Sequence, residues 1–240
     1  MIKKILLSLG LIIAALAAGG YTFYETSDQF GANLTDQQMA TYRASSNYDG
    51  NVFLNQIETI EDASFANIKG MLKDFIFNSV STEPSRPIEV VRVSKEELLS
   101  NHSETQSLWF GHSTFLMQIN GMNLLFDPML TTTPSPHPML GSTRYSNELP
   151  ISIADLPSAD AVFVSHDHYD HLDLESIQQL DAKVGHYFVP LGVGLHLQHW
   201  GIAPERITEL DWWQSANLGA VEFTFTPSRH FSGRKVEHRN

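Results

Sequence analysis

Residues 161–172 read AVFVSHDHYDHL, so a loop rich in metal-ligating side chains follows directly on a short apolar run. In an extended turn, His166 and His168 point the same way, and both imidazoles can reach one metal ion. Asp170 and His171 stand at the entrance of the next helix and can reach a second ion. Neutral imidazole and carboxylate suit Zn²⁺, and imidazole also suits iron or manganese. The loop therefore predicts a metal site that follows a buried strand.

Short apolar runs separated by turn residues surround this loop, and they predict alternating strands and helices. Asn120-Gly121 is typical of a tight hairpin between two of the strands. Asp173 is a suitable N-cap for the helix that follows the histidine-rich loop. Strands are expected at 108–110, 114–119, 123–126, 161–164, 184–189, 206–210 and 220–226, and helices at 172–180 and 192–200. The resulting class is a layered α/β (α+β) fold.

Four motifs occur in order along this part of the chain: WFGHST (109–114), FDP (126–128), SHDHYDHL (165–172) and TPSRHFSGR (226–234). H-x-H-x-D-H after a short strand is the signature of the metallo-β-lactamase superfamily of hydrolases. Together the motifs resemble the branch that contains N-acyl-phosphatidylethanolamine-hydrolysing phospholipase D. The resemblance covers about residues 89–234. It implies an αββα sandwich with the metals at one edge of the two sheets.

The resemblance also implies the roles of single residues. His166, His168 and His230 would bind a first zinc ion, and Asp170 and His171 a second. Two such cations lower the pKa of a bridging water and generate hydroxide, which attacks a phosphorus or carbonyl centre. Asp170 would also orient the hydroxide, which makes it the expected catalytic residue.

Asp127 has two interpretations, because it either orients ligands from beneath the site or forms a turn before Pro128. His112 is expected to have a packing or loop role rather than to ligate. Helical or strand packing is the expected role of the other histidines, His186, His196 and His199. The tryptophans Trp200, Trp212 and Trp213 are interpreted as core or sheet-edge aromatics, which could also line an acyl pocket.

The composition limits the possible partners and chemistry. The chain has 240 residues, of which 42% are hydrophobic, and its formal net charge is −12. The acidic balance argues against a nucleic-acid partner held through phosphates. Because cysteine is absent, disulfides, thiolate ligands and a cysteine nucleophile are excluded. We expect a small-molecule or lipid substrate, and the sequence leaves the oligomeric state open.

Residues 1–24 form a membrane-directed segment in which Lys3 and Lys4 precede a long uncharged, largely apolar stretch. A cleaved signal peptide, with an A-x-A-like site at 15–17, and an uncleaved anchor both fit this pattern. Both place the remainder outside the cytoplasm, in the periplasm or anchored to the inner membrane and facing the periplasm. Residues 25–87 are interpreted as an accessory segment with a helix within 57–77 and a linker at 81–87. Residues 88–240 are expected to form the metallo-β-lactamase-like domain.

Members of the resembled family continue beyond the TPSRHFSGR motif and supply a bridging Asp and a further His. The sequence printed here ends at Asn240, so an incomplete domain is expected, with the second half of the sandwich largely missing. His238 in the polar tail is not expected to replace the further His. On this interpretation the first position keeps three histidines, which allows one zinc ion here rather than the two of the family. The functional alternatives are a phospholipase D-like hydrolase, another esterase or lactonase, and a truncated non-catalytic metal-binding remnant.

Overall fold

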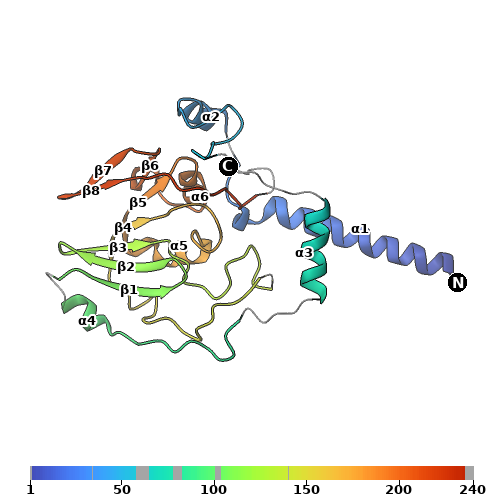
Figure 1. Cartoon of the computed structure of the whole chain (residues 1–240), viewed down its shortest axis with the longest axis horizontal. Helices are drawn as coiled ribbons and strands as arrows, with labels where there is room; N and C mark the ends of the chain where they lie inside the picture. The colour runs from blue at the N-terminus through green and yellow to red at the C-terminus, as the bar shows by residue number, and fades with distance from the viewer. Residues whose placement is uncertain are drawn as a thin grey trace.

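The computed structural model describes residues 2–33, 35–57, 65–77, 83–100, 104–139 and 141–235. At its centre is a six-stranded sheet in the order β1-β2-β3-β4-β5-β6, accompanied by a two-stranded β7-β8 sheet (Figure 1). The strands are β1 (Gln106–Gly111), β2 (Thr114–Ile119), β3 (Met122–Phe126), β4 (Ala159–Phe163), β5 (Val184–Pro190), β6 (Ile207–Leu210), β7 (Ser215–Leu218) and β8 (Val221–Thr224). The helices are α1 (Ile2–Thr26), α2 (Asp36–Arg43), α3 (Phe65–Phe77), α4 (Lys95–Ser100), α5 (Leu174–Leu180) and α6 (Val193–His199), with short 3₁₀ turns η1 (Asp28–Phe30), η2 (Asp181–Lys183) and η3 (Pro204–Arg206).

The sheet is mixed, with an antiparallel half and a parallel half. Strands β1, β2 and β3 pair antiparallel, and β3, β4, β5 and β6 pair parallel. The β2–β3 hairpin turns at Asn120 and Gly121, whose φ angles are 52° and 75°. Two successive positive φ angles are the requirement of a type I′ turn, which Asn-Gly meets at low cost. The predicted hairpin and the mixed α/β class are both confirmed.

One face of the sheet carries the main hydrophobic core. Val162 and Tyr187 on this face are fully buried, as are Leu172, Ile177 of α5 and Leu197 of α6. Strands and helices contribute to the same cluster, because alternate strand residues and one stripe of each helix point into it. The core therefore fixes the end of β4, from which the histidine-rich loop emerges.

The opposite face carries a row of phenylalanines. Phe115, Phe126, Phe163 and Phe188 occupy directly paired positions on β2, β3, β4 and β5. Successive rings are stacked, with centroids 4.5, 4.9 and 5.1 Å apart. The β7-β8 hairpin packs on this face, and the ring centroid of Phe223 lies 4.6 Å from that of Phe163. Both faces of the central strands thus contribute apolar packing.

Several local expectations differ from the structure. Strand β7 and helices α2 and α4 were not predicted. Strand β7 reads SANL and has little β-propensity, so its pairing with β8 determines its conformation. The helix expected within 57–77 is observed as α3, and residues 58–64 of that range lie outside the described residues. His238 also lies outside them.

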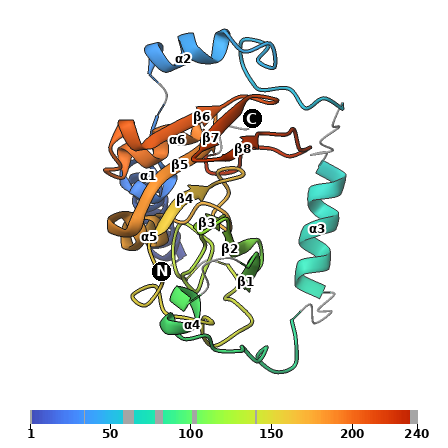
Figure 2. The same ribbon diagram turned by 90° about the vertical axis from the view of Figure 1, so that its left-hand side faces the viewer.

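The N-terminal helix α1 extends away from the sheets (Figure 1). Its segment Lys3–Thr26 has a mean hydropathy of 2.0 and is not buried by the rest of the chain. It is long and apolar enough to cross a membrane, and signal sequences share these properties. Figure 2 shows α2 beside the β6 end of the sheet and α3 standing apart from the strands.

Candidate metal centre

The histidine-rich loop begins where β4 ends, and its own backbone folds it into a turn. The backbone N–H groups of His171 and Leu172 donate to the carbonyl of His168, at 3.1 and 2.8 Å. Asp173 then caps α5, since its side chain accepts from the backbone N–H of Ser176 at 2.9 Å. The predicted N-cap is present. Strand, turn and cap together hold the loop at the edge of the sheet.

The structure brings His166, His168 and His230 together, with one ligand atom from each lying within 4.8 Å of the others. We call these three residues the first cluster. Nε2 of His230 lies 3.1 Å from Nδ1 of His168. Two nitrogens at about 2.0–2.1 Å from one tetrahedral zinc ion would lie roughly 3.4 Å apart. The spacing of the His168 and His230 nitrogens is therefore close to that of two ligands of one zinc ion, and His166 offers a third nitrogen within 4.8 Å of both.

His166 offers a free ligand atom in the first cluster. Its Nδ1 lies 2.9 Å from the hydroxyl of Ser165, while its Nε2 is buried without a hydrogen-bond partner. A buried unpaired nitrogen is costly unless something occupies it, and a metal ion would satisfy it. Burial, followed by the charges of the neighbouring imidazoles, lowers the pKa of His166 to about 3. The ring therefore stays neutral, as metal ligation requires.

A second cluster consists of His112, Asp170 and His171, again with ligand atoms within 4.8 Å of one another. Oδ2 of Asp170 lies 2.8 Å from Nε2 of His112 and 3.8 Å from Nε2 of His171. His112 was expected to have a packing or loop role, and the structure instead places its imidazole against Asp170. It reaches this position from the tight β1–β2 turn, where its φ is 47°. In the sequence, the Gly111-His112 pair indicates this turn.

Asp127 bonds to His171 of the second cluster and to Ser165, whose hydroxyl contacts His166 of the first. Its carboxylate accepts from the backbone N–H of Ser165 at 2.7 Å, from the hydroxyl of Ser165 at 2.8 Å and from Nδ1–H of His171 at 2.8 Å. Its φ of 44° also makes it a turn residue, so both interpretations of Asp127 describe its geometry. Because Nδ1 of His171 is committed to this carboxylate, Nε2 is left to face Asp170.

The two clusters adjoin, since the ring centroids of His166 and His171 are 4.0 Å apart. His230 joins from the segment after β8, which is anchored near the histidine-rich loop. The hydroxyl of Ser232 donates to Asp167 at 2.5 Å, and the buried guanidinium of Arg234 donates to the carbonyl of Asp167 at 2.9 Å. Segments distant in sequence are thereby joined at one edge of the sheet.

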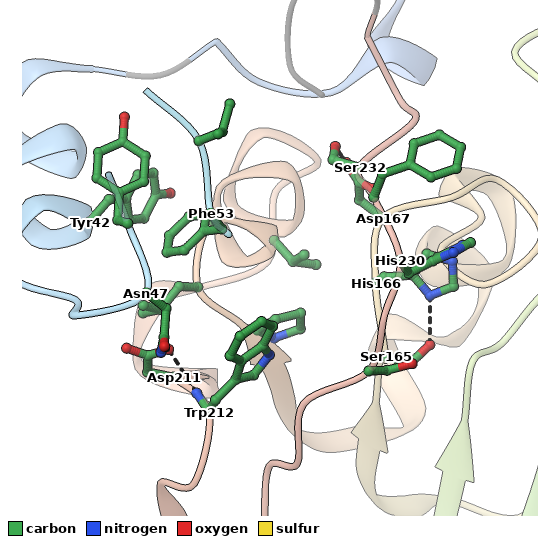
Figure 3. A pocket seen from close by; sticks show the side chains of 18 of the residues that line it. Tyr42, Asn47, Phe53, Ser165, His166, Asp167, Asp211, Trp212, His230 and Ser232 are labelled. Carbon is green, nitrogen blue, oxygen red and sulfur yellow. Dashed lines mark hydrogen bonds between the residues drawn. The ribbon is translucent and has the colours of Figure 1, made fainter. Parts of the chain in front are cut away.

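A cavity of about 490 Å³ opens beside the first cluster (Figure 3). His166 and His230 stand at one side of it, and Tyr42 and Phe53 of the N-terminal segment stand at the other. Its remaining lining is largely apolar and includes Tyr48, Val52, Val193, Leu195, Leu210, Trp212 and Phe225. Sequence reasoning missed the residues at 42–55, because nothing in their pattern indicates that they approach the histidines.

The other singled-out tryptophans and histidines lie in different surroundings. Trp200 is buried as expected and Trp212 lines the cavity, whereas Trp213 is 63% exposed and is not a core residue. His196 also lines the cavity, and its Nδ1 accepts from the backbone N–H of Ala32 at 3.0 Å. His186 bonds to Thr208 within the sheet, in keeping with a packing role. His196 was expected only to pack on its helix, whereas its side chain also lines the cavity and bonds to the N-terminal segment.

A mixed α/β sheet with adjoining His and His/Asp clusters at one edge defines an α/β protein with two groups of side chains that could each hold a metal ion. Residues 122–240 match the family described as "Beta-lactamase superfamily domain". These residues of the chain therefore form a domain of the metallo-β-lactamase superfamily.

The similarity to other proteins extends beyond residues 122–240 of this chain. An uncharacterized protein of Mycobacterium tuberculosis (strain ATCC 25618 / H37Rv) is 35% identical over 230 residues, which are 92% of this chain and 60% of that protein. N-acyl-phosphatidylethanolamine-hydrolyzing phospholipase D 1 of Caenorhabditis elegans is 32% identical over 151 residues, covering 58% of this chain and 42% of the relative. A UPF0173 metal-dependent hydrolase of Pyrobaculum neutrophilum is 29% identical, covering 54% of this chain and 52% of the relative. The chain thus spans three fifths or less of the length of each of these relatives.

Among solved structures, the metallo hydrolase Igni18 from Ignicoccus hospitalis is similar, with a TM-score of 0.40 and 22% sequence identity. The match covers 56% of this chain and 53% of the other.

Proposed function

We propose that this protein is a metal-dependent hydrolase that cleaves phosphodiester bonds in lipids of the N-acyl-phosphatidylethanolamine type. The observation that carries the proposal is the largely apolar cavity of about 490 Å³ that ends at His166 and His230. Its volume is in the range of small-molecule sites. The similarity to phospholipases D named for this lipid class supports the same substrate.

On this proposal the first cluster holds one divalent cation, for which Zn²⁺ suits three imidazoles. Asp170 and His171, together with His112, hold a second. A cation held in these positions would supply Lewis-acid chemistry, which polarises a substrate oxygen and favours attack by water at neutral pH.

The chain's own residues do the remaining work. Asp170 accepts a hydrogen bond from the attacking water and orients it. Tyr42, Phe53 and Trp212 hold the apolar part of the substrate and exclude bulk water from the phosphodiester. Asp127 fixes the tautomer of His171 through the 2.8 Å hydrogen bond to Nδ1.

Export is part of the proposal. Lys3 and Lys4 precede the apolar helix α1, so the N-terminus stays in the cytoplasm and the cavity lies on the far side of the membrane. An uncleaved α1 would keep the cavity close to a lipid surface, which agrees with a lipid substrate.

The test uses the full chain loaded with Zn²⁺ and vesicles that contain N-acyl-phosphatidylethanolamine. Mass spectrometry should detect phosphatidic acid and N-acylethanolamine, and His166→Ala should abolish their release. His199→Ala is the matched control, because His199 bonds to Asp28 away from both clusters. No phosphatidic acid but rapid opening of a lactone would contradict the lipid assignment and favour the esterase or lactonase. Tight zinc binding without turnover of any ester would favour a non-catalytic metal-binding protein.

A further inference from the structure

Asn55 contacts the backbone of His230 at two points, although it belongs to the N-terminal segment. Its Nδ2 donates to the carbonyl of His230 at 3.0 Å, and its Oδ1 accepts from the N–H of His230 at 3.1 Å. A side-chain amide has both a donor and an acceptor, so it can pair with one residue much as a neighbouring strand would. Two simultaneous bonds fix orientation as well as distance.

His230 needs such support because of where it lies. Strand β8 ends at Thr224, and residues 226–233 belong to no helix or strand. The imidazole of His230 nevertheless has to meet that of His168, whose Nδ1 is 3.1 Å away. A ligand on an irregular segment depends on specific hydrogen bonds to hold its position.

The loop that carries Asn55 is itself held against the domain. Asp211, which follows β6, accepts from the hydroxyl of Ser45 at 2.6 Å and from Nδ2 of Asn47 at 3.0 Å. The carbonyl of Asn47 accepts in turn from the backbone N–H of Leu54 at 2.8 Å. Figure 3 shows Asn47 and Asp211 next to each other, on the side of the cavity opposite His166. This chain of bonds ends one residue before Asn55.

Aromatic packing stiffens the same loop. The ring of Phe53 lies 5.5 Å from that of Tyr42 and 5.1 Å from that of Tyr48, measured between centroids. Tyr48 and Phe53 also form an isolated antiparallel bridge. Ordering the loop in advance lowers the entropic cost of placing Asn55 against His230.

We propose that Asn55 is a positioning residue that sets the place of His230 in the first cluster, and with it the affinity of that cluster for zinc. The N-terminal segment is then part of the metal centre, and not only a wall of the cavity. The inference rests on the first cluster of the proposed function and not on the substrate.

The test measures the affinity of the full, chelator-stripped chain for Zn²⁺ by competition with a chromophoric chelator. Asn55→Leu keeps the approximate shape of the side chain and removes both hydrogen bonds, and Asn55→Ala removes the side chain. Each should weaken zinc binding by about 10- to 100-fold, the usual effect of losing a group that orients a ligand. Asn51→Ala is the matched control, because Asn51 also lines the cavity and should leave the affinity unchanged.

A spectroscopic measurement separates positioning from general destabilisation. With Co²⁺ in place of zinc, both Asn55 variants should change the visible absorption of the ion, while circular dichroism shows a folded metal-free chain. Zinc affinities and Co²⁺ spectra equal to those of Asn51→Ala would overturn the inference. So would unfolding of both Asn55 variants beside a folded control, since two hydrogen bonds from a half-buried side chain should not decide whether the chain folds.

The outcomes are distinguishable from failure of the proposed function. Tight zinc binding that weakens in the Asn55 variants, without any lipid hydrolysis, would support the positioning role and contradict the lipase proposal. A wild-type chain that binds no zinc would overturn both.

Discussion

Replacing Asp127 by asparagine tests how the two clusters are held. The carboxylate accepts three hydrogen bonds, two from Ser165 and one from Nδ1–H of His171, all between 2.7 and 2.8 Å. Asparagine keeps the shape and tolerates the φ of 44° better than most residues. Its Oδ1 can still accept from the backbone N–H of Ser165. Its Nδ2, however, is a donor, and it would face the hydroxyl of Ser165 and Nδ1 of His171, which both donate to the carboxylate in the wild-type protein.

The hydroxyl of Ser165 can adapt to this reversal, because it has two lone pairs and can accept from the introduced amide and from His166 together. His171 adapts only by accepting at Nδ1, which moves its proton to Nε2. That atom faces Asp170 at 3.8 Å, and a protonated Nε2 cannot bind a metal. Asp127→Asn should therefore impair the second cluster and leave the first largely intact.

The expected loss at the second cluster is about 10- to 100-fold in metal affinity. This corresponds to about 1.4–2.8 kcal/mol, since each tenfold change is about 1.4 kcal/mol. The value lies in the range of one hydrogen bond to a charged group, about 1.5–3 kcal/mol.

Zinc titration calorimetry and elemental analysis would measure affinity and stoichiometry, and ¹⁵N NMR would report the tautomer of His171. Asp160→Asn is the matched control, because Asp160 is exposed and bonds to the backbone N–H of Asn123, away from both clusters. Unchanged affinities and an unchanged tautomer would refute the reasoning, as would a loss confined to the first cluster.

Three other positions offer shorter tests. Gly233→Ala should disrupt the first cluster, because a Cβ there would overlap Nε2 of His168, whereas Gly70→Ala meets open space and should leave zinc binding unchanged. His112→Ala should lower zinc affinity at the second cluster by about tenfold, measured by calorimetry, and equal affinities would rule out its involvement. Burial raises the pKa of Glu209, so its contribution to stability should be fully present below pH 4.5 and be lost as pH rises through the folded-state pKa. Glu209→Gln should remove this component, and an identical pH dependence of urea unfolding in both proteins would contradict it.

Much of the domain's local structure could be predicted from the sequence. The hairpin at Asn120-Gly121, the N-cap at Asp173 and strand β2 were all predicted at their observed places. These features depend on residues adjacent in the chain, because alternation, turn dihedrals and caps are satisfied locally. The boundary expected near residue 87 stays a prediction, as do the individual metal-ligand assignments.

Strand β7 and the role of His112 could not be predicted in this way. The sequence of β7 has little preference for a strand, and its ladder with β8 supplies the stabilisation. His112 meets Asp170 only because β1 and β2 place their turn at the same sheet edge as the loop after β4. The Gly-His pair indicates a turn, and it contains no information about which strand lies next to that turn.

By itself, the sequence indicated the resemblance to the superfamily, most strands and helices of the domain, and the loop that carries His166, His168, Asp170 and His171. Only the tertiary structure decided which distant residues join them. Asn55 reaches His230 across 175 positions in the chain, and Asp127 reaches His171 across 44. The reason is physical: periodicity and turn chemistry act over a few residues, whereas long-range proximity is set by the order of strands in the sheet and by the packing of the core.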